Sequence, residues 1–546
     1  MKQKLCALLA GLMIIAALSG CTGNTNAPAT SAPDATPTEQ VTTPDTTDAN
    51  ASGNADEAPA NKVDGGTFIM PITADVSNLN ISLTSSITDI QCLQPLYDCL
   101  WHSTMAAGTN YYLAESCDIS DDGLTYTVKL VENAKWHDGE PITVDDLIYT
   151  INMSLETGKN SRAVELDDVP VTYERIDDYT LAITICRPDS AYFTNLGRLF
   201  IQPEHVFGGK LDILGAEENM LGIGSGPFKL VEWNKGESLV YERNTDYYRG
   251  TPSLEKVIVR IIPDSAVQEI AFDNGELSMF TPSTAQQVEK YLNAEGVTTV
   301  EYYDGNNTSI WLNSMSDNPV MNDIDARRAI ALALNIPEIV AGALGSDHLG
   351  TAAVGIFTPV TMYYDDTVKN WEQDLDTAKK LADKTGLTGQ TLRYIYNSDR
   401  FFVKNIALIV QQQLKEIGVN VEIVGLDTAA YNSRKKGVEW DLLTQNTDQL
   451  NSDPGTKQTM FSGKTKSVNK GELTNMLWDL ACGAIDLTER EAYFEAIQHL
   501  QMYDLGYIGI FCSKTFIVAK DEFAGLDAKP TTVMFQDWTD IYKVAK

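Results

Sequence analysis

The amino-acid composition changes abruptly at Val63, and this change limits where the chain can fold. The 41 residues from Thr22 to Lys62 are almost wholly Thr, Ala, Pro, Asn, Asp, Ser and Gly, and they include no aromatic residue. Such a segment cannot bury enough apolar surface to offset the loss of chain entropy, so we expect it to be disordered. As a coil it reaches on the order of 35 Å. The fold must therefore be built by the residues from Val63 to Lys546.

The first residues have the layout of an export signal. Lys2 and Lys4 precede an apolar run from Leu5 to Leu18, and at 14 residues this run is too short to span a bilayer. The tetrapeptide Leu18-Ser19-Gly20-Cys21 resembles the bacterial lipobox, in which the cysteine is acylated and becomes the new N-terminus. Two or three acyl chains hold a protein to a membrane.

We therefore predict a signal peptide over residues 1–20, lipid attachment at Cys21 and a tether over 21–62. The tether would hold the body at the extracellular face of a cell membrane. The alternative is an ordinary cleaved signal followed by a chance cysteine.

The charge of the chain excludes one class of partner. Lys and Arg number 41 and Asp and Glu number 75, which gives a formal charge of −34. This charge repels nucleic-acid phosphates and anionic lipid headgroups, so we expect no nucleic-acid partner. A chain of 546 residues is too long for one core, and two or three domains are expected. No later segment approaches 18 continuous apolar residues, so we expect no membrane span after export.

Six cysteines remain once Cys6 and Cys21 are set aside with the leader. They are scattered, without a C-x-x-C pair or a histidine at metal-ligand spacing: Cys92, Cys99, Cys117, Cys186, Cys482 and Cys512. We expect mostly buried thiols, which pack as small hydrophobes, with one or two disulfides as the alternative.

The body mixes strand and helix patterns. In DDGLTYTVKL a turn at Asp122-Gly123 leads into alternating apolar residues, and PSLEKVIVRIIP predicts a second strand. The segment DLDTAKKLADKTG predicts a helix that starts at an Asp and stops at Gly386. A helix ending at Gly418, a strand over Val419–Val424 and two helical patterns over Thr474–Tyr503 follow. The fold class is therefore mixed α/β.

The sequence does not match the residue motifs of the common enzyme classes that we compared with it. The five histidines lie far apart, and none sits in an H-E-x-x-H motif. Ser225 in GIGSGPF lacks the glycine two residues earlier that a nucleophile elbow needs, and its neighbouring glycines precede a strand and not a helix. In SGKTKS, at Ser462, the first glycine of a phosphate loop would fall on Gln458. We therefore predict neither an enzyme nor a cofactor or metal site.

Two long motifs carry a resemblance to a known family. They are LAESCDISDDGLTYTVKLVENAKWHDGEPITVDDLIYT, from Leu113 to Thr150, and GSGPFKLVEWNKGESLVYERNTDYYRGTPSLEKVIVRIIPD, from Gly224 to Asp264. Both resemble segments of the bacterial extracellular solute-binding proteins of family 5, which serve ABC transporters of the peptide and nickel class. DIDARRAIALALNIPEIV and ALIVQQQLKEIGVNVEI match in the family's order. The likeness runs from about Gly65 to the C-terminus.

The resemblance implies a two-lobed hinged clamp of the type II periplasmic-binding-protein class, with an extra third subdomain. Lobe one would comprise residues 63–101, 221–303 and 515–546, the extra subdomain 102–220, and lobe two 304–514. The lobes would close on a small solute, most simply a di- or oligopeptide, and a permease would read the closure. Gram-positive members are typically lipoproteins, which agrees with the lipobox. We expect the protein to be a monomer.

The family motifs also have physical interpretations. In KWHDGEPITVDDL, His137-Asp138-Gly139 suits a turn, and Thr143 with Asp146 resembles an N-capping box. Gly224 and Gly226 permit a tight crossing before a strand. We therefore expect these motifs to be scaffold and not ligand contacts.

Peptide-binding members of the family commonly place an aspartate near a D-P pair, after a Trp, where it anchors the ligand ammonium. The corresponding stretch here is WDLLTQNTDQLNSDPGT, in which Asn446 or Thr447 fills the Trp position. Asp448 lies two residues farther from Asp453-Pro454 than the family spacing suggests. A buried ammonium needs a paired carboxylate, so Asp448 is the first candidate and Asp453 the second. The alternative is that Asp453 merely starts a turn.

Other candidates follow strand ends that we expect to face the hinge. They are Asp75 after TFIMPITA, Asn306 and Asn307 before SIWLN, and Tyr396 and Asn397 after LRYIY. Asparagine amides bond a peptide backbone or sugar hydroxyls equally well, and a core position is the alternative for Tyr396. Oligosaccharides, nickel complexes and opines are alternative solutes. A lipid-anchored hydrolase and an exported chaperone or adhesin are the alternatives outside this class.

Overall fold

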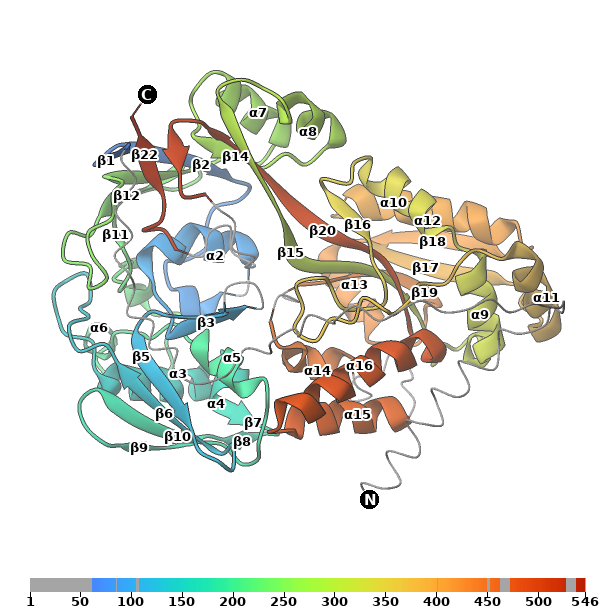
Figure 1. Ribbon diagram of the computed structural model, residues 1–546, viewed down its shortest axis with the longest axis horizontal. Helices are drawn as coiled ribbons and strands as arrows, with labels where there is room; N and C mark the ends of the chain where they lie inside the picture. The colour runs from blue at the N-terminus through green and yellow to red at the C-terminus, as the bar shows by residue number, and fades with distance from the viewer. Residues whose placement is uncertain are drawn as a thin grey trace, which may run out of the picture. The chain divides into compact units, whose positions relative to one another are not determined.

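Figure 1 shows the computed structural model of the protein, which describes residues 61–84, 86–104, 108–399, 401–448, 452–461, 472–526 and 537–545. The predicted signal peptide, Cys21 and nearly all of the predicted tether lie outside the described residues. Within the described part of the chain, three larger sheets are each packed against a hydrophobic core.

The first sheet has the strand order β11-β12-β13-β2. Its strands are β2 (Thr67–Ile72), β11 (Phe228–Asn234), β12 (Ser238–Arg243) and β13 (Lys256–Ile261). The pairing of β13 with β2 is parallel, and the other two pairings are antiparallel. Val257 and Val259 alternate into the core beside Phe68 and Met70, which confirms the strand predicted from PSLEKVIVRIIP. The short helices α2 (Ile87–Leu93) and η2 (Gln94–Leu96) lead into β3 (Trp101–Thr104).

The second sheet is antiparallel, with the order β5-β6-β10-β9. Its strands are β5 (Ala114–Ile119), β6 (Thr125–Leu130), β9 (Thr172–Arg175) and β10 (Thr180–Thr184). Tyr126, Val128 and Leu130 are buried in alternation, as the sequence DDGLTYTVKL predicts. Helix α3 (Val144–Thr157) packs Leu147 and Ile151 into the same core.

The third sheet has the order β14-β20-β15-β19-β17-β18, with β16 paired to β20. Its strands are β14 (Met279–Phe280), β15 (Val297–Leu312), β16 (Gly350–Ala352), β17 (Thr391–Asn397), β18 (Asn420–Leu426), β19 (Leu442–Thr447) and β20 (Tyr507–Lys520). Strand β17 pairs in parallel with β18 and β19. The other pairings in this sheet are antiparallel.

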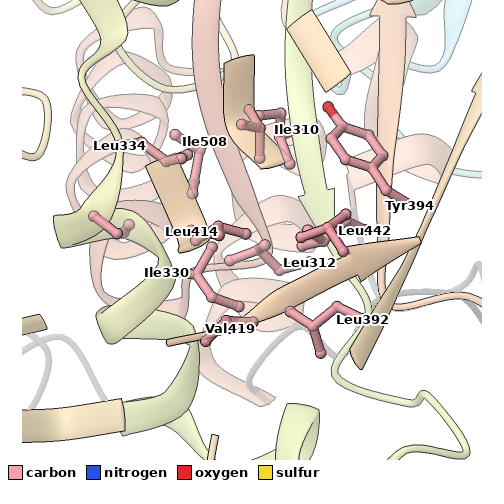
Figure 2. Packing of buried hydrophobic residues seen from close by; sticks show 14 of the residues in the cluster. Ile310, Leu312, Ile330, Leu334, Leu392, Tyr394, Leu414, Val419, Leu442 and Ile508 are labelled. Carbon is pink, nitrogen blue, oxygen red and sulfur yellow. The ribbon is translucent and has the colours of Figure 1, made fainter. Parts of the chain in front are cut away.

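Helices build the core on this sheet, and Figure 2 shows part of that packing. They are α9 (Ile324–Ala333), α10 (Ile336–Leu344), α11 (Leu375–Thr385) and α12 (Phe401–Lys415). Helix α11 has Asp374 as its N-cap and Gly386 as its C-cap, as predicted. Helix α12 ends three residues before the predicted stop at Gly418, because the chain tightens into i to i+3 hydrogen bonds after Leu414.

A second core near this sheet is rich in aromatic residues, including Trp440, Trp478 and Phe494. The helices that contribute to it are α13 (Thr428–Lys435), α14 (Gln458–Phe461), α15 (Glu472–Gly483) and α16 (Leu487–Asp504). The last two helices confirm the two helical patterns predicted over Thr474–Tyr503.

Strands β15 and β20 connect the cores. They pair from Val297 opposite Lys520 to Trp311 opposite Tyr507. Ile517 of β20 packs in the core of the first sheet, while Ile508 of the same strand packs under α9 and α12. Helices α7 (Ser265–Asp273) and α8 (Ala285–Tyr291) cover the end of the two strands where β14 pairs with β20.

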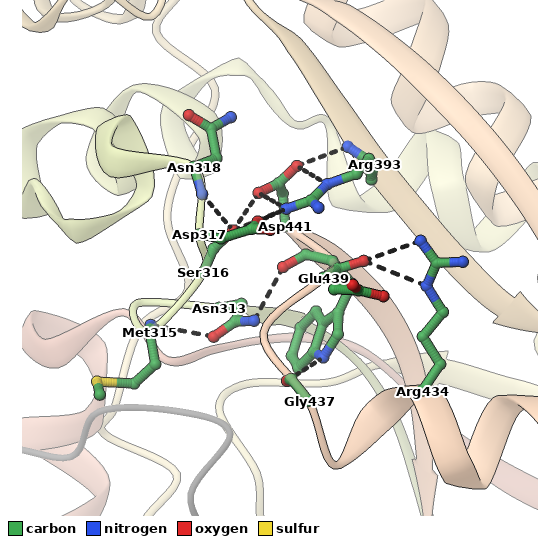
Figure 3. Close-up of polar contacts among 11 residues, drawn as sticks. Asn313, Met315, Ser316, Asp317, Asn318, Arg393, Arg434, Gly437, Glu439 and Asp441 are labelled. Carbon is green, nitrogen blue, oxygen red and sulfur yellow. Dashed lines mark hydrogen bonds and ion pairs between the residues drawn. The ribbon is translucent and has the colours of Figure 1, made fainter.

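A buried carboxylate ties three segments of the third sheet, as Figure 3 shows. Asp441, fully buried, accepts hydrogen bonds from Ser316 Oγ at 2.5 Å and from Nε of Arg393 at 3.1 Å. It also accepts from the backbone N–H of Arg393 at 2.8 Å. This network fixes β17 to the residue before β19 and to the loop after β15.

The remaining elements are short. They are β1 (Lys62–Val63), β4 (Gly108–Tyr111), β7 (Glu165–Leu166), β8 (Val169–Pro170), β21 (Phe523–Ala524), β22 (Tyr542–Val544), α4 (Ser161–Val164), α5 (Tyr192–Gly197), α6 (Glu204–Phe207), η1 (Ile81–Leu83), η3 (Glu217–Met220), η4 (Pro319–Asn322) and η5 (Pro454–Lys457). Strand β1 pairs with β22. The six cysteines of the body are free; Cys92, Cys99, Cys482 and Cys512 are buried and Cys186 is exposed, which confirms the prediction of mostly buried thiols.

Candidate functional site

The pairing of strands β15 and β20 is irregular in the middle of the two strands. Their register shifts between Tyr303 and Asn307, where β15 bulges. Two cavities, of about 320 and 230 Å³, meet at this bulge, because Ser283, Asp304 and Asn306 line both of them. We call this pair of cavities the hinge cavity.

The hinge cavity contains one carboxylate and several polar oxygens. Asp304 accepts hydrogen bonds from the backbone N–H of Asn306 at 2.9 Å and from Ser513 Oγ at 3.0 Å, and burial raises its pKa to about 6. The Oδ1 atom of Asn306 and the Oγ1 atom of Thr281 are buried without a hydrogen-bond partner among the described residues. Because a buried acceptor without a partner is costly, these atoms favour a ligand that brings N–H groups.

The end of β19 lies beside the same bulge. Its register pairs Thr308 with Asn446 and Asn307 with Thr447, so Asp448 follows at the level of Asn306. Asn446 lines the smaller of the two cavities. The structure therefore places Asn306 and Asp448, two of the residues predicted from the sequence, next to the same end of the β15–β19 pairing.

Asp448 forms an ion pair with one cation and interacts electrostatically with two more. Lys457 Nζ lies 3.2 Å from Asp448 Oδ1. The charge of Asp448 also acts on Arg198 and, less than that of Asp189, on Arg162. Arg198 Nη2 donates to Ser452 Oγ at 3.3 Å, and Arg162 donates to the carbonyl of Thr456. Burial lowers the pKa of Lys457, with a smaller contribution from the two arginines. We call Arg162, Arg198 and Lys457 the cation cluster.

Asp453 lies in a different environment from Asp448. It is 3% exposed and caps the short helix η5, where it accepts from the backbone N–H of Gly455 at 2.7 Å. Arg490 Nη1 is 3.8 Å from its Oδ2, and burial raises its pKa to about 6. Asp453 thus starts a turn, which is the alternative to an ammonium-binding role that the sequence analysis gave for this residue. Asp453 also lines a cavity of about 590 Å³ together with Asp189 and Arg490.

The other predicted residues have structural partners. Asp75 accepts from Trp233 Nε1 at 3.1 Å and from the backbone N–H of Gly236 at 2.8 Å. Asn307 is buried and donates to the carbonyl of Gly355 at 3.3 Å. Tyr396 packs in the core of the third sheet, which is the core position given above as the alternative to a ligand contact. Asn397 donates a hydrogen bond to Thr428 Oγ1 at 3.0 Å.

Sequence reasoning missed the cation cluster and Asp304. Arg162 and Arg198 stand in segments without a recognisable motif, and both lie more than 250 positions before Lys457. A signal for Asp304 exists in the run YYDGNNTSIWLN, where four polar or glycine residues interrupt a strand pattern.

The described residues contain no helix long and apolar enough to cross a membrane. They also contain no group of three or more His, Cys, Asp or Glu side chains placed to hold a metal ion.

Sheets joined by two long strands, with a polar cavity where those strands bulge, define the class of two-lobed solute-binding clamps. The family model of the bacterial extracellular solute-binding proteins, family 5, matches residues 109–469. The protein belongs to this family, which confirms the resemblance and the two-lobed α/β fold read from its sequence.

The similar proteins agree with this assignment. The chain is 27% identical over 416 residues to the "Oligopeptide-binding protein AppA" of Bacillus subtilis, covering 72% of this chain and 75% of that protein. It is 25% identical over 433 residues to the "Probable D,D-dipeptide-binding periplasmic protein DdpA" of Escherichia coli, covering 77% and 82%.

Solved structures show the same fold. The ABC transporter substrate-binding protein CtaP of Listeria monocytogenes superposes with a TM-score of 0.81 at 30% identity, over 88% of this chain and all of the other. The nickel-histidine complex of NikZ from Campylobacter jejuni has a TM-score of 0.74 at 18% identity, over 87% of this chain and 99% of the other, and this likeness shows the fold alone. The family and these relatives are solute-binding proteins, so the protein is a solute-binding protein of ABC transport and not an enzyme.

Proposed function

We propose that this protein captures a di- or oligopeptide beside the hinge strands and delivers it to the permease of an ABC importer. The observation that carries the proposal is the hinge cavity, where the acceptor oxygens of Asn306 and Thr281 stand beside the Asp304 carboxylate. A peptide supplies the backbone N–H groups and the ammonium that such acceptors bind. The relatives named for peptides support the same choice.

Asp448 is the residue that we assign to the ligand ammonium. Its side chain is 45% exposed, and it contacts Lys457 through one oxygen. Because a carboxylate accepts several hydrogen bonds, Asp448 can hold Lys457 and an ammonium together. Asp453 is the second candidate; Asn306 contributes hydrogen bonds to the peptide backbone.

Native mass spectrometry tests the choice of solute. The protein is measured as purified, and again after unfolding and refolding with pools of peptides, oligosaccharides and nickel complexes. We expect a retained or captured peptide, and its loss in Asp448→Asn with the fold intact. Selective capture of a sugar or a metal complex would replace the peptide assignment, while capture of nothing by correctly refolded protein would contradict it.

We also propose that a lipid on Cys21 tethers the protein, as a monomer, to the outer face of a Gram-positive cell membrane. The motif Leu18-Ser19-Gly20-Cys21 and the Pro- and Thr-rich segment after it support this. In cell fractions, the protein is expected with the membrane and Cys21→Ser in the medium. An equal distribution of both proteins would contradict the anchor.

A further inference from the structure

We propose that the hinge cavity is a subsite for a positively charged side chain of the ligand, with Asp304 as the opposite charge. This inference rests on the proposed peptide function and narrows it to peptides whose first residue is lysine or arginine. It gives Asp304 a role separate from that of Asp448, which we assign to the ligand ammonium.

The hydrogen-bond partners of Asp304 are all neutral groups. They are the backbone N–H of Asn306 at 2.9 Å, Ser513 Oγ at 3.0 Å and the side chain of Thr515. Among the described residues that line the hinge cavity, Asp304 is the one with a charged side chain. The cavity therefore contains a negative charge that no lining side chain balances.

Two other buried carboxylates of this fold each have a cation beside them. Asp441 lies 3.1 Å from Arg393 Nε, and Asp453 lies 3.8 Å from Arg490 Nη1. A carboxylate that leaves water is destabilised unless an opposite charge accompanies it, and burial raises the pKa of Asp304 to about 6. A cationic group in the hinge cavity would supply the opposite charge and keep the Asp304 carboxyl ionised.

The walls of the hinge cavity suit the stem of a basic side chain. Ile72 lines the larger of the two cavities, and Leu344 and Leu349 line the smaller one. The methylene groups of lysine and arginine pack on apolar surface of this kind while the charged end stays at polar groups. Asp304 lines both cavities, and the unpartnered Oγ1 of Thr281 in the larger one is a second acceptor for the N–H groups of the charged end.

The proposed ammonium site adjoins the hinge cavity. Thr308 Oγ1 of β15 donates to Asn446 Oδ1 of β19 at 3.3 Å, and both residues line the smaller cavity. Because side chains alternate along an extended strand, Asp448 continues the face to which Asn446 belongs. A peptide whose ammonium is held by Asp448 therefore begins at the rim of the hinge cavity, and the side chain of its first residue is the one that can enter.

Calorimetric titration of the protein with two matched tripeptide pools tests the inference. One pool has lysine as its first residue and the other has norleucine, which has the same carbon chain without the ammonium; the other two positions vary equally in both. We expect the lysine pool to bind at least about tenfold more tightly, because it gains a charge-assisted hydrogen bond. In Asp304→Asn, the affinity for the lysine pool is expected to fall to that for the norleucine pool, which stays unchanged.

Glu301→Gln is the matched control, because Glu301 lies on the same strand but pairs with Lys514 Nζ at 2.6 Å and with His348 Nδ1 at 2.5 Å. This variant is expected to keep the preference for the lysine pool. An equal loss of both pools in folded Asp304→Asn would overturn the inference, since it would show that Asp304 only supports the structure.

The unmodified protein separates this inference from the proposed function. Equal binding of the lysine and norleucine pools would overturn the cation subsite and leave the peptide function standing. Binding of neither pool would overturn both. This comparison needs no variant, so it holds even if Asp304→Asn fails to fold.

Discussion

At the scale of single residues, Gly224 and Gly226 show why a family motif serves the scaffold. A Cβ on Gly224 would lie 1.9 Å from the carbonyl oxygen of Leu96, and one on Gly226 would lie 2.6 Å from the carbonyl carbon. The imidazole of His137 completes the contact: its Nδ1 accepts from Gly224 N–H at 3.1 Å, so Nε2 carries the proton toward the Gly226 carbonyl at 3.1 Å. Burial lowers the pKa of His137 to about 4, which keeps it neutral.

Gly224→Ala is expected to destabilise the protein by about 2–4 kcal/mol, because the added methyl group overlaps backbone that cannot move aside. Urea unfolding measures the change. Gly215→Ala is the control: no atom lies within 4 Å of its Cβ position, so its change should stay within about 0.5 kcal/mol. Equal effects of the two substitutions would contradict the close crossing.

The buried pair of Arg393 and Asp441 is a second test at this scale. Arg393→Met leaves the fully buried Asp441 carboxylate without its cation, and we expect a loss of about 3–5 kcal/mol in unfolding free energy. Arg243→Met is the matched control, because its partner Asp64 has a side chain that is 77% exposed. That change should cost at most about 1 kcal/mol. A small loss for Arg393→Met would show that the network is not needed for stability.

At the scale of elements, one carboxylate positions the start of α3. Asp146 accepts from Thr143 N–H at 3.1 Å, which closes the capping box predicted from the sequence. It also accepts from Trp136 Nε1 at 3.3 Å and from the backbone N–H of Glu204 at 3.0 Å. The same side chain therefore joins the HDG turn, α3 and α6.

Asp146→Ala is expected to cost about 2–4 kcal/mol, because it leaves several buried donors without an acceptor. Thr143→Ala removes only the hydroxyl of the cap, at a cost of about 1 kcal/mol. Thermal unfolding followed by circular dichroism ranks the two variants. The reverse order would show that α3 is held by its cap alone and not by the contacts of Asp146 with its neighbours.

Elements and caps were predictable from the sequence, whereas the charge environment of the site was not. The alternation of buried and partly exposed residues in β6 and the capping residues of α11 depend on residues close to one another in the sequence, so the local sequence pattern predicts them. Asp448 was identified by its distance along the chain from a D-P pair. Its electrostatic environment depends on Arg162 and Arg198, which only the tertiary fold brings near.

At the scale of the whole molecule, buried carboxylates lie where separate parts of the fold meet. Asp304 stands at the bulge between β15 and β20, and Asp453 lines a cavity shared with Asp189 of the second sheet's region. Burial raises the pKa of Asp304 and that of Asp453 to about 6. Each folded carboxyl thus holds its proton more strongly than in the unfolded chain, where the pKa is about 3.9.

The stabilising contribution of Asp453 is therefore full below about pH 4 and is lost as the pH rises through about 6. Asp453→Asn removes this dependence. Relative to the unmodified protein, the variant should gain up to about 3 kcal/mol between pH 4 and pH 7. Denaturant unfolding at several pH values measures the difference. A constant difference across this range would contradict the raised pKa.

The pairing of β1 with β22 brings the first and the last strand of the described body side by side. Lys62 stands opposite Val544, so the point where the body begins adjoins the point where it finishes. A short peptide could link these neighbouring ends without disturbing any sheet, and new ends could then be opened in an exposed loop. A circularly permuted chain of this kind is therefore expected to keep the same arrangement of elements in space.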